Sequence, residues 1–481
     1  MTEQMLPSSV NYLDTLPRAI PSERVRRKFY SSNGRSFGPN QTIKIDIESP
    51  KAFLDPSNCF LEFDFTNTSG GLTCALDLGG SYGFVKNFRI HQGGTEILRL
   101  TNLNRLMSAV LVPGGTNLSS KANSSITGQQ RYNNDVGAGV LNTPEAANAT
   151  GGDLMFGTQL GSDTDIGNNA TVKLTMPLVG GLFSQTGTQK LLPLPLLNKP
   201  IELYFDLAPL AEPLCFSAGA PTAWTIDNVS VVADLVEVPR DVVGFMRELQ
   251  FNNGGSLALQ GQNYEYNAGV LPAASSGNVV LNIPSRKRSI KGIFFAGSSR
   301  NYGVGGVVPE TQCFSLSYSG AMCVSSYFLR AGALVMPQPA VQCAGNTNVA
   351  GNAEYKKAEQ FLEFKKAMGH LGHGVGTGLL STISYGNRDG DNSDGGGGQQ
   401  SPASDDLFDA SPFGLDLDAY QNEAIRAGLD TQTLSLEMAL NLTIEDDGGG
   451  ATFTEDQQVD IFSLYDIQYY INSDGSITYE D

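Results

Sequence analysis

The chain has 481 residues, of which 40% are hydrophobic, and it contains 55 glycines and 23 prolines. This length is enough for two or three domains that each bury a core, and the glycine and proline content predicts a loop-rich globular protein. The formal net charge of −18 argues against a dedicated nucleic-acid-binding protein, because such a protein needs a broad basic face. An acidic surface instead favours solubility.

The cysteines and the first residues indicate the compartment. Six cysteines are scattered without a C-x-x-C pair, and most lie in apolar runs such as Cys59-Phe60-Leu61. This pattern predicts buried free thiols in a reducing compartment. Residues 1–14 lack the basic start and apolar core of a signal peptide, and the chain has no run of about 18 apolar residues. We therefore expect synthesis and assembly in the cytosol or nucleus.

Residues 1–38 are predicted to form an N-terminal arm. A local excess of positive charge, which we call the basic cluster, consists of Arg24, Arg26, Arg27 and Lys28. The cluster is either a solvated tail or a tether that contacts a negative surface, such as nucleic acid, anionic lipid or an acidic partner protein.

Alternation of apolar and polar residues begins after the arm and predicts β-strands. Strands are expected at Thr42–Glu48 and Cys59–Thr66, separated by a turn that contains Pro50, Asp55 and Pro56. The later strands of this first unit are expected at Thr171–Met176, Pro200–Leu207 and Thr225–Val238.

Between these strands the pattern changes three times. Phe84–Ile90 and Glu96–Leu100 predict a hairpin around Gly93-Gly94, and Leu103–Leu111 has the spacing of a short helix. Residues 113–170 are polar and aperiodic, which predicts a long exposed loop. The prolines of Leu191–Leu197 exclude that apolar run from a central strand.

The second unit repeats this theme. Its expected strands are Val279–Ile283, Ile290–Ala296, Phe314–Tyr318, Ser325–Val335, Thr433–Ile444 and Val459–Ile471. Ala353–Met368 is the clearest predicted helix, with Gly369 as a plausible stop. The glycine- and aspartate-rich stretch Asn387–Asp405 predicts a second long loop within residues 385–412.

The strand-like blocks occur twice in the same order. Val279–Ile283 follows Ile43–Ile47 at an offset of 236, and Phe462–Ile467 follows Val229–Leu235 at an offset of 233. Further matches join Phe88–Ile90 to Phe328–Arg330 and Ile201–Phe205 to Leu434–Met438. We infer that one β domain was used twice, in residues 39–240 and 241–481. The predicted fold is all-β, with two consecutive eight-stranded jelly-roll sandwiches, a few short helices and long loops; another Greek-key sandwich stays open.

Four segments resemble parts of catalytic, metal-binding or charged binding sites. Gly79–Gly83 matches G-x-S-x-G, but its surroundings are all-β, so a glycine-rich turn is favoured over a nucleophile elbow. Asp389–Gly395 lacks the glycine and glutamate spacing of a calcium loop, and His370 and His373 lack a third ligand nearby. Arg286–Arg288 with Lys291 is interpreted as a solvated turn. We therefore predict no catalytic residues, no metal site, no cofactor and no enzymatic activity.

Three stretches in order carry a resemblance. They are Ala52–Phe63, then Leu192–Leu197 with Ile201–Leu203, and then Tyr327–Gly332 with Met336–Pro339. Over residues 40–475 the chain resembles the double jelly-roll major capsid proteins of the lineage that contains virophages, polinton-like viruses, adenoviruses and nucleocytoplasmic large DNA viruses.

The resemblance implies a structural subunit of an icosahedral DNA-virus shell. Three copies would form a homotrimer with a pseudo-hexagonal outline, and these capsomers would tile the shell. Its partners would be neighbouring capsomers, minor capsid and penton proteins, and an internal membrane or the genome through the N-terminal arm, without a small-molecule substrate. The protein would be made in the host cytoplasm, assembled there or in the nucleus, and reside in the virion.

Two other functions stay open at this point. A secreted or surface carbohydrate-binding β-sandwich protein would have a signal peptide, aromatic side chains on one face and a calcium site. A hydrolase built on Gly79–Gly83 would depend on Ser81. The capsid interpretation instead requires only that the protein bind copies of itself.

Overall fold

The computed structural model describes residues 22–70, 74–76, 79–111, 166, 168–185, 190–210, 212–216, 223–252, 255–273, 275, 277–299, 324–343, 358–369, 412–419, 428–442 and 456–481. The predicted strand Phe314–Tyr318 and the loop 387–405 lie outside the described residues, as does most of the loop 113–170. Within the described part, no helix is both long and apolar enough to cross a membrane.

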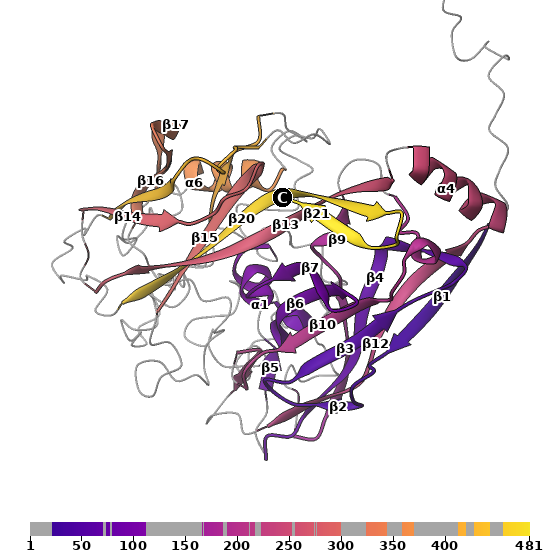
Figure 1. Ribbon diagram of the computed structural model, residues 1–481. Helices are drawn as coiled ribbons and strands as arrows, with labels where there is room; N and C mark the ends of the chain where they lie inside the picture. Colours follow the sequence, from indigo (N-terminus) through magenta and orange to yellow (C-terminus); the bar gives the residue numbers. More distant parts are fainter. Residues whose placement is uncertain are drawn as a thin grey trace, which may run out of the picture.

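The first half of the chain forms a sandwich of two antiparallel sheets (Figure 1). One sheet has the strand order β1-β12-β4-β8, and the other has the order β3-β10-β6-β7. Their strands are β1 (Glu23–Tyr30), β3 (Thr42–Ile47), β4 (Ala52–Asn67), β6 (Val85–Gln92), β7 (Thr95–Leu100), β8 (Thr171–Pro177), β10 (Ile201–Leu207) and β12 (Trp224–Glu237). Short strands are β2 (Ser36–Phe37), β5 (Cys74–Leu76), β9 (Gly181–Gln185) and β11 (Leu214–Phe216).

The second half forms a sandwich of the same design. Its sheets have the orders β18-β15-β20-β13-β9 and β14-β19-β16-β17, and β21 pairs with β20. The strands are β13 (Ser256–Leu271), β14 (Gly277–Ile283), β15 (Ile290–Ser299), β16 (Val324–Ala331), β17 (Leu334–Gln342), β18 (Phe413–Asp416), β19 (Leu436–Leu442), β20 (Gln457–Asn472) and β21 (Ile477–Glu480).

The two halves have identical strand orders. If the eight main strands of each half are counted along the chain, one sheet has the order 1-8-3-6 and the other 2-7-4-5 in both halves. This crossed order is that of a jelly roll, in which two Greek keys fold into two facing sheets. The prediction of two consecutive eight-stranded jelly rolls is confirmed.

The predicted arm is too long, because β1 is the first strand of the first jelly roll. Every residue from Glu23 to Tyr30 pairs with β12, although only Phe29 of β1 is buried. A strand at the edge of a sheet can be charged because it buries little, and charges there oppose unwanted pairing. Residues 22–38 therefore belong to the sandwich.

The predicted turn around Pro56 does not end a strand. β4 runs through it, and the register with β12 shifts between the pairs Val232–Phe60 and Asp234–Asp55. The carboxylate of Asp55 accepts hydrogen bonds from the Ser57 amide, 3.2 Å, and hydroxyl, 2.7 Å, as a turn-forming aspartate does. The local turn chemistry is present, but it makes a bulge inside a longer strand.

The predicted hairpin and both helices are confirmed. Gly93 and Gly94 have φ values of +57° and +87°, which favour glycine, in the turn between β6 and β7. Leu103–Leu111 begins as helix α1 (Leu103–Leu106) and continues as a π-helical turn. The second helix is α6 (Ala358–Ala367), after which Gly369 has a φ of +75°.

Two matches of the repeat need correction. The match of Phe88–Ile90 to Phe328–Arg330 sets Phe88, which is buried in the core, against Phe328, which lies on the outer face of β16. The match of Val229–Leu235 to Phe462–Ile467 sets Val231 against Leu464. Val231 points into the core of its sandwich, whereas Leu464 is half-buried on the outer face of its own sheet. Alternate residues of a strand face opposite sides, so the true equivalence is shifted by an odd number of residues.

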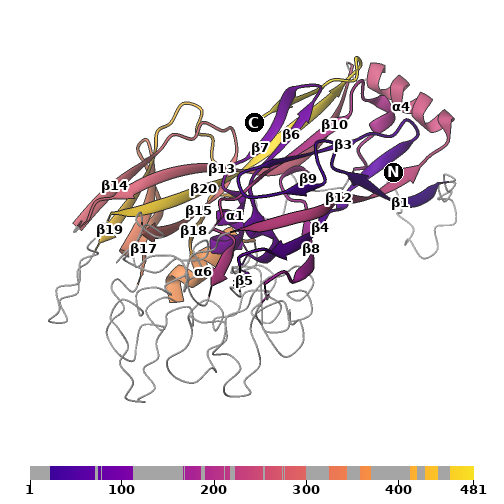
Figure 2. The same ribbon diagram turned by 90° about the horizontal axis from the view of Figure 1, so that it is seen from below.

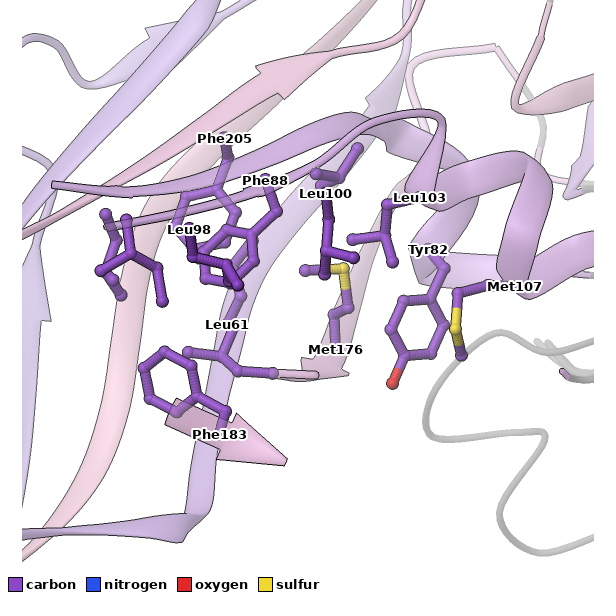
Figure 3. Close-up of a cluster of buried hydrophobic side chains, with 14 of the residues drawn as sticks. Leu61, Tyr82, Phe88, Leu98, Leu100, Leu103, Met107, Met176, Phe183 and Phe205 are labelled. Atoms are coloured by element: carbon purple, nitrogen blue, oxygen red, sulfur yellow. The ribbon is translucent and has the colours of Figure 1, made fainter. Parts of the chain in front are cut away.

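Side chains from both sheets interdigitate in the core of the first jelly roll (Figure 3). Phe88 of β6 stacks on Phe205 of β10 with ring centroids 5.0 Å apart, and it also contacts Phe183 at 6.1 Å. Trp224 is 1% exposed and donates its indole N–H to the Leu210 carbonyl oxygen, 3.0 Å away. Burial of a large aromatic side chain contributes about 1.5–3 kcal/mol, so this layer dominates the stability of the sandwich.

The connections leave the sandwiches at two ends. The pairs Asn67–Trp224 and Thr66–Thr171 place the end of β4 beside the starts of β12 and β8. The long connections after β4, β7 and β10 therefore all leave from one end, here called the loop end, and the same holds in the second jelly roll. The opposite end, here called the base, carries the helix α4 (Arg240–Asn252) that joins the two jelly rolls (Figure 2). The sequence did not predict this helix.

Candidate assembly surfaces

The basic cluster lies on an open sheet edge. β1 pairs with β12 on one side, and no strand in the described ranges pairs with its other side. Tyr30 at its end is 66% exposed and Val25 is 38% exposed, which is unusual for large apolar side chains of a sheet. This edge is therefore available for contact with another molecule.

Part of the basic cluster is already paired with carboxylates of its own sheet. Arg24 forms ion pairs with Asp55, 2.7 Å, and Asp234, 2.8 Å. Lys28 contacts Glu62 at 2.8 Å, and this carboxylate also contacts Lys173. Of the two alternatives, a solvated tail does not apply to the residues of β1, because they form a paired strand and part of their charge lies against the sheet.

The remaining two members lie over aromatic rings. The guanidinium of Arg26 is 5.5 Å from the ring centroid of Phe60, and that of Arg27 is 5.3 Å from that of Phe29. Stacking of this kind holds an exposed cation in place and leaves its N–H donors able to bind a partner.

The pKa of Glu62 reports how strongly this face is neutralised. Hydrogen bonds from Lys173 and then Lys28 lower it, and they outweigh the opposing effect of burial. The carboxylate therefore stays ionised in mildly acidic solution and keeps both lysines on the sheet.

The equivalent edge of the second jelly roll is covered. β13 is the counterpart of β1, and β9 of the first jelly roll pairs with its outer side through Gly261–Gln185 and Gln262–Gly181. β7 also contacts β13, and the C-terminal β21 contacts β7 (Figure 1). One jelly roll thus covers the first strand of the next, whereas no strand among the described residues covers the outer side of β1.

A buried ion pair joins the two jelly rolls. Arg105 of α1 donates through Nε to Asp460 of β20 at 2.8 Å and through a terminal nitrogen to the Gly297 carbonyl oxygen at 3.0 Å. The two side chains are 8% and 3% exposed. The Tyr266 hydroxyl also donates to Asp460 at 2.8 Å, and burial together with this carboxylate raises the pKa of Tyr266.

Apolar side chains from the same elements, such as Leu106 of α1 and Phe462 of β20, lie in a shared cluster. They form the interdomain cluster of Leu106, Ala109, Val110, Phe294, Ala296, Phe361, Phe364 and Phe462. Because the cluster draws on both halves of the chain, the relative placement of the two jelly rolls is held by a core and not only by a linker.

The outer faces of the two sandwiches differ. In the first, Lys44, Tyr204 and Arg89 stand side by side on β3, β10 and β6, and both cations lie over the tyrosine ring at 5.6 and 5.4 Å. Burial alone would lower the pKa of Lys44, but hydrogen bonds to Glu202 and Asp46 outweigh it and raise the pKa. We call Lys44, Tyr204 and Arg89 the charged row.

The corresponding sheet of the second jelly roll carries an apolar row on its outer face. Val280, Ala439 and Phe328 lie side by side on β14, β19 and β16, one row away from the ion pair of Arg330 and Glu437. Val280 is 48% exposed. The two jelly rolls thus have similar cores but different outer sheet faces. This difference allows the two jelly rolls of one chain to contact different neighbours.

The G-x-S-x-G match is a structural turn. Gly80–Phe84 forms a 3₁₀ turn before β6, and Ser81 is fully buried, with its hydroxyl donating to the Thr175 carbonyl oxygen at 2.8 Å. The neighbouring Tyr82 hydroxyl donates to the Pro177 carbonyl oxygen at 3.0 Å, and burial raises its pKa. Ser81 thus holds β8 and does not face a cleft.

Only part of the second basic group is a solvated turn, because Arg286 and Arg288 are exposed whereas Lys287 and Lys291 are paired with carboxylates. The ammonium of Lys287 lies 4.5 Å from the ring centroid of Tyr465 and forms an ion pair with Asp481. Lys291 is 8% exposed and contacts Asp418 at 3.2 Å. Charge density in the sequence did not reveal that acidic partners from distant strands neutralise these lysines.

The structure describes the predicted buried Cys59 but not the two motifs that resemble metal sites. Cys59 is buried, and burial raises the pKa of its thiol to about 12. His370, His373 and Asp389–Gly395 lie outside the described residues. Among the residues that the structure describes, no group of three or more His, Cys, Asp or Glu side chains could hold a metal ion.

Comparison with known proteins gives matches at the level of structure. No protein-family model matches the chain, and no curated protein matches it in sequence. The chain is similar to the cryo-EM structure of the Sputnik virophage, with a TM-score of 0.55 and 12% identity over 99% of this chain and 92% of that one. It is also similar to the capsid of PBCV-1 virus, with a TM-score of 0.54 and 10% identity over 97% and 99% of the two chains.

A third match is the Faustovirus major capsid protein, with a TM-score of 0.55 and 7% identity over 95% of this chain and 91% of that one. The chain has a double jelly-roll fold. The matches extend over both jelly rolls and not over one alone, so the whole architecture is shared. At this level of identity the likeness concerns the fold, because few side chains are common.

Proposed function

We propose that the protein is a major capsid protein, a self-assembling structural subunit without enzymatic activity. The observation that carries this proposal is the pair of jelly rolls with identical strand order, joined by a rigid buried interface. The likeness to capsid proteins along nearly the entire chain supports it. A rigid block with two similar units suits a shell, because a threefold assembly of such blocks has six similar sides.

The capsomer is a homotrimer in this proposal. Within one chain the first jelly roll covers β13, the first strand of the second. Repeating that relation between chains places the second jelly roll of one copy against β1 of the next. The basic cluster (Arg24, Arg26, Arg27 and Lys28) then lies in the contact between copies, where the exposed Tyr30 is also buried.

The two ends of the molecule have different neighbours in the shell. The loop end carries the long connections and faces outward, and the base faces the interior. There the base meets minor capsid proteins, an internal membrane or the genome, while penton proteins meet the trimer at the vertices. The protein resides in the virion, after synthesis in the host cytoplasm and assembly there or in the nucleus.

Light scattering on the purified protein tests the proposal. The expected mass is about three times the 51.2 kDa of one chain, with hexagonal outlines in negative-stain images. Tyr30→Glu should convert trimers to monomers, because it introduces a charge into the contact. Tyr479→Glu is the matched control, since Tyr479 is 49% exposed on β21, away from β1. A wild-type monomer at every concentration would refute the trimer.

A further inference from the structure

An apolar groove of about 730 Å³ lies at the base. Val242 and Met246 of α4 form one wall, Leu257 and Leu259 of β13 form another, and Phe53 of β4 contributes to the lining. The groove thus lies where the linker helix meets both jelly rolls. Its volume is in the range of sites that hold a short peptide segment or a small molecule.

The lining provides few polar groups for a ligand. Lys190, Ser256 and the Tyr470 hydroxyl are its polar side-chain groups, and that hydroxyl already donates to Glu480 at 3.2 Å. Leu191 at the rim is 39% exposed. The groove therefore suits an apolar occupant, because a charged or strongly polar one would lose its hydration without replacement hydrogen bonds.

The N-terminal segment leaves the fold beside this groove. Glu23 pairs with Glu237 in the ladder of β1 and β12, and Val238, the residue that follows β12, lines the groove. The 21 residues before the described part could span about 70 Å if extended, far more than the distance to the groove requires. A tether of this length keeps the segment at an effective concentration of roughly millimolar at the groove.

The segment has the composition that the groove requires. Residues 1–21 contain only three charged side chains, Glu3, Asp14 and Arg18. Their large apolar residues are Met1, Met5, Leu6, Val10, Tyr12, Leu13, Leu16 and Ile20. Several of these could enter the groove together, whereas the acidic side chains would stay in water.

We propose that the groove binds residues 1–21 of the same chain through their apolar side chains. This intramolecular contact covers α4 and fastens the linker helix to the base. It does not depend on the proposed capsid function, because the groove and its occupant belong to one chain. The basic cluster follows directly in β1, so the docked segment also fixes the start of that edge strand.

Trypsin provides a direct test on the full-length protein. Arg18 is the sole trypsin site in residues 1–21, and cleavage after it is measured by mass spectrometry over time. Met246→Glu places a charge in the groove and should speed this cleavage at least about tenfold, because proteolysis follows the population of the undocked segment. Phe245→Ser is the matched control, since Phe245 is 59% exposed on the same helix and does not line the groove.

A second variant avoids any effect on the folded part. Leu13→Ser combined with Leu16→Ser changes only the segment and should also speed cleavage by about tenfold. Equal cleavage rates in the wild type and in both test variants would overturn the proposal. Protection of Arg18 that increases with protein concentration would overturn it in favour of docking into a second copy. Protection that appears only with lipid vesicles would overturn it in favour of a membrane.

Discussion

Removal of Arg105 should uncouple the two jelly rolls. In the Arg105→Met variant, Asp460 stays buried with its hydrogen bonds from Tyr266 and Gln458 but loses its cation, and the Gly297 carbonyl oxygen loses a donor. Breaking a buried ion pair by removing one partner costs about 3–5 kcal/mol. The methionine retains much of the apolar volume, so the loss is electrostatic and not a cavity effect.

Two probes of urea unfolding measure this effect. Trp224 lies in the core of the first jelly roll, and it is the single tryptophan of the chain, so its fluorescence reports that unit alone. Far-ultraviolet circular dichroism reports both units. We expect one shared transition in the wild type, and in Arg105→Met an earlier transition in which the two probes separate.

Arg99→Met is the matched control. Arg99 is exposed and pairs with Glu96 three residues earlier, a contact that contributes less than about 1 kcal/mol. Adding Asp460→Leu to Arg105→Met should restore most of the lost stability, because no unpaired charge then remains. A loss below about 1 kcal/mol in Arg105→Met, with coincident probes, would refute the reasoning.

Three further predictions concern single sites. Gly181→Val should cost about 2–4 kcal/mol in thermal unfolding, because φ is +53° and a Cβ atom would lie 2.3 Å from the Tyr469 hydroxyl; an unchanged Tm contradicts this. Ser81→Ala should lose about 1 kcal/mol in urea unfolding and leave the capsomer intact in negative stain, whereas a lost esterase activity would contradict a structural role. Lys173→Met should raise the pKa of Glu62. Because the pKa of Glu62 is lower in the folded protein than in the unfolded chain, the wild type should have a higher Tm than the variant above about pH 4.5. This difference in Tm should disappear as the pH falls through the pKa of Glu62 in the folded protein. A difference in Tm that does not change with pH contradicts the prediction.

Local sequence patterns predicted the elements that depend mainly on their own and neighbouring residues. The hairpin at Gly93-Gly94 follows from the positive φ values that two glycines accept, and α6 ends at Gly369 for the same reason. Strands such as β3 and β10 alternate because one of their faces is buried, which the sequence displays directly. The duplication was predictable because the same alternation occurs twice.

The sequence did not predict the elements that form only through contacts with residues far away in the chain. β1 has one buried side chain, Phe29, so only its ladder with β12 makes it a strand. α4 is mostly exposed, and Val242 and Met246 on its apolar face line the groove at the base instead of a closed core. β9 is a strand only because it pairs with the other jelly roll.

For the candidate surfaces too, the sequence predicted the composition but not the contacts made in the folded protein. The basic cluster was visible as a run of charge, but its orientation was not, because Asp55, Asp234 and Glu62 approach it only after the sheet has formed. The groove at the base joins residues from β4, α4, β13 and β20, which share no pattern along the chain.

The sequence by itself determined that this protein is all-β and duplicated, because burial of one strand face imposes a two-residue period wherever it occurs. Tertiary structure alone decided where each jelly roll begins, how the two are fixed to each other, and which edge stays open. Those properties depend on pairing between distant strands and on a few buried charges such as Arg105 and Asp460, whose partners are chosen only when the sheets meet.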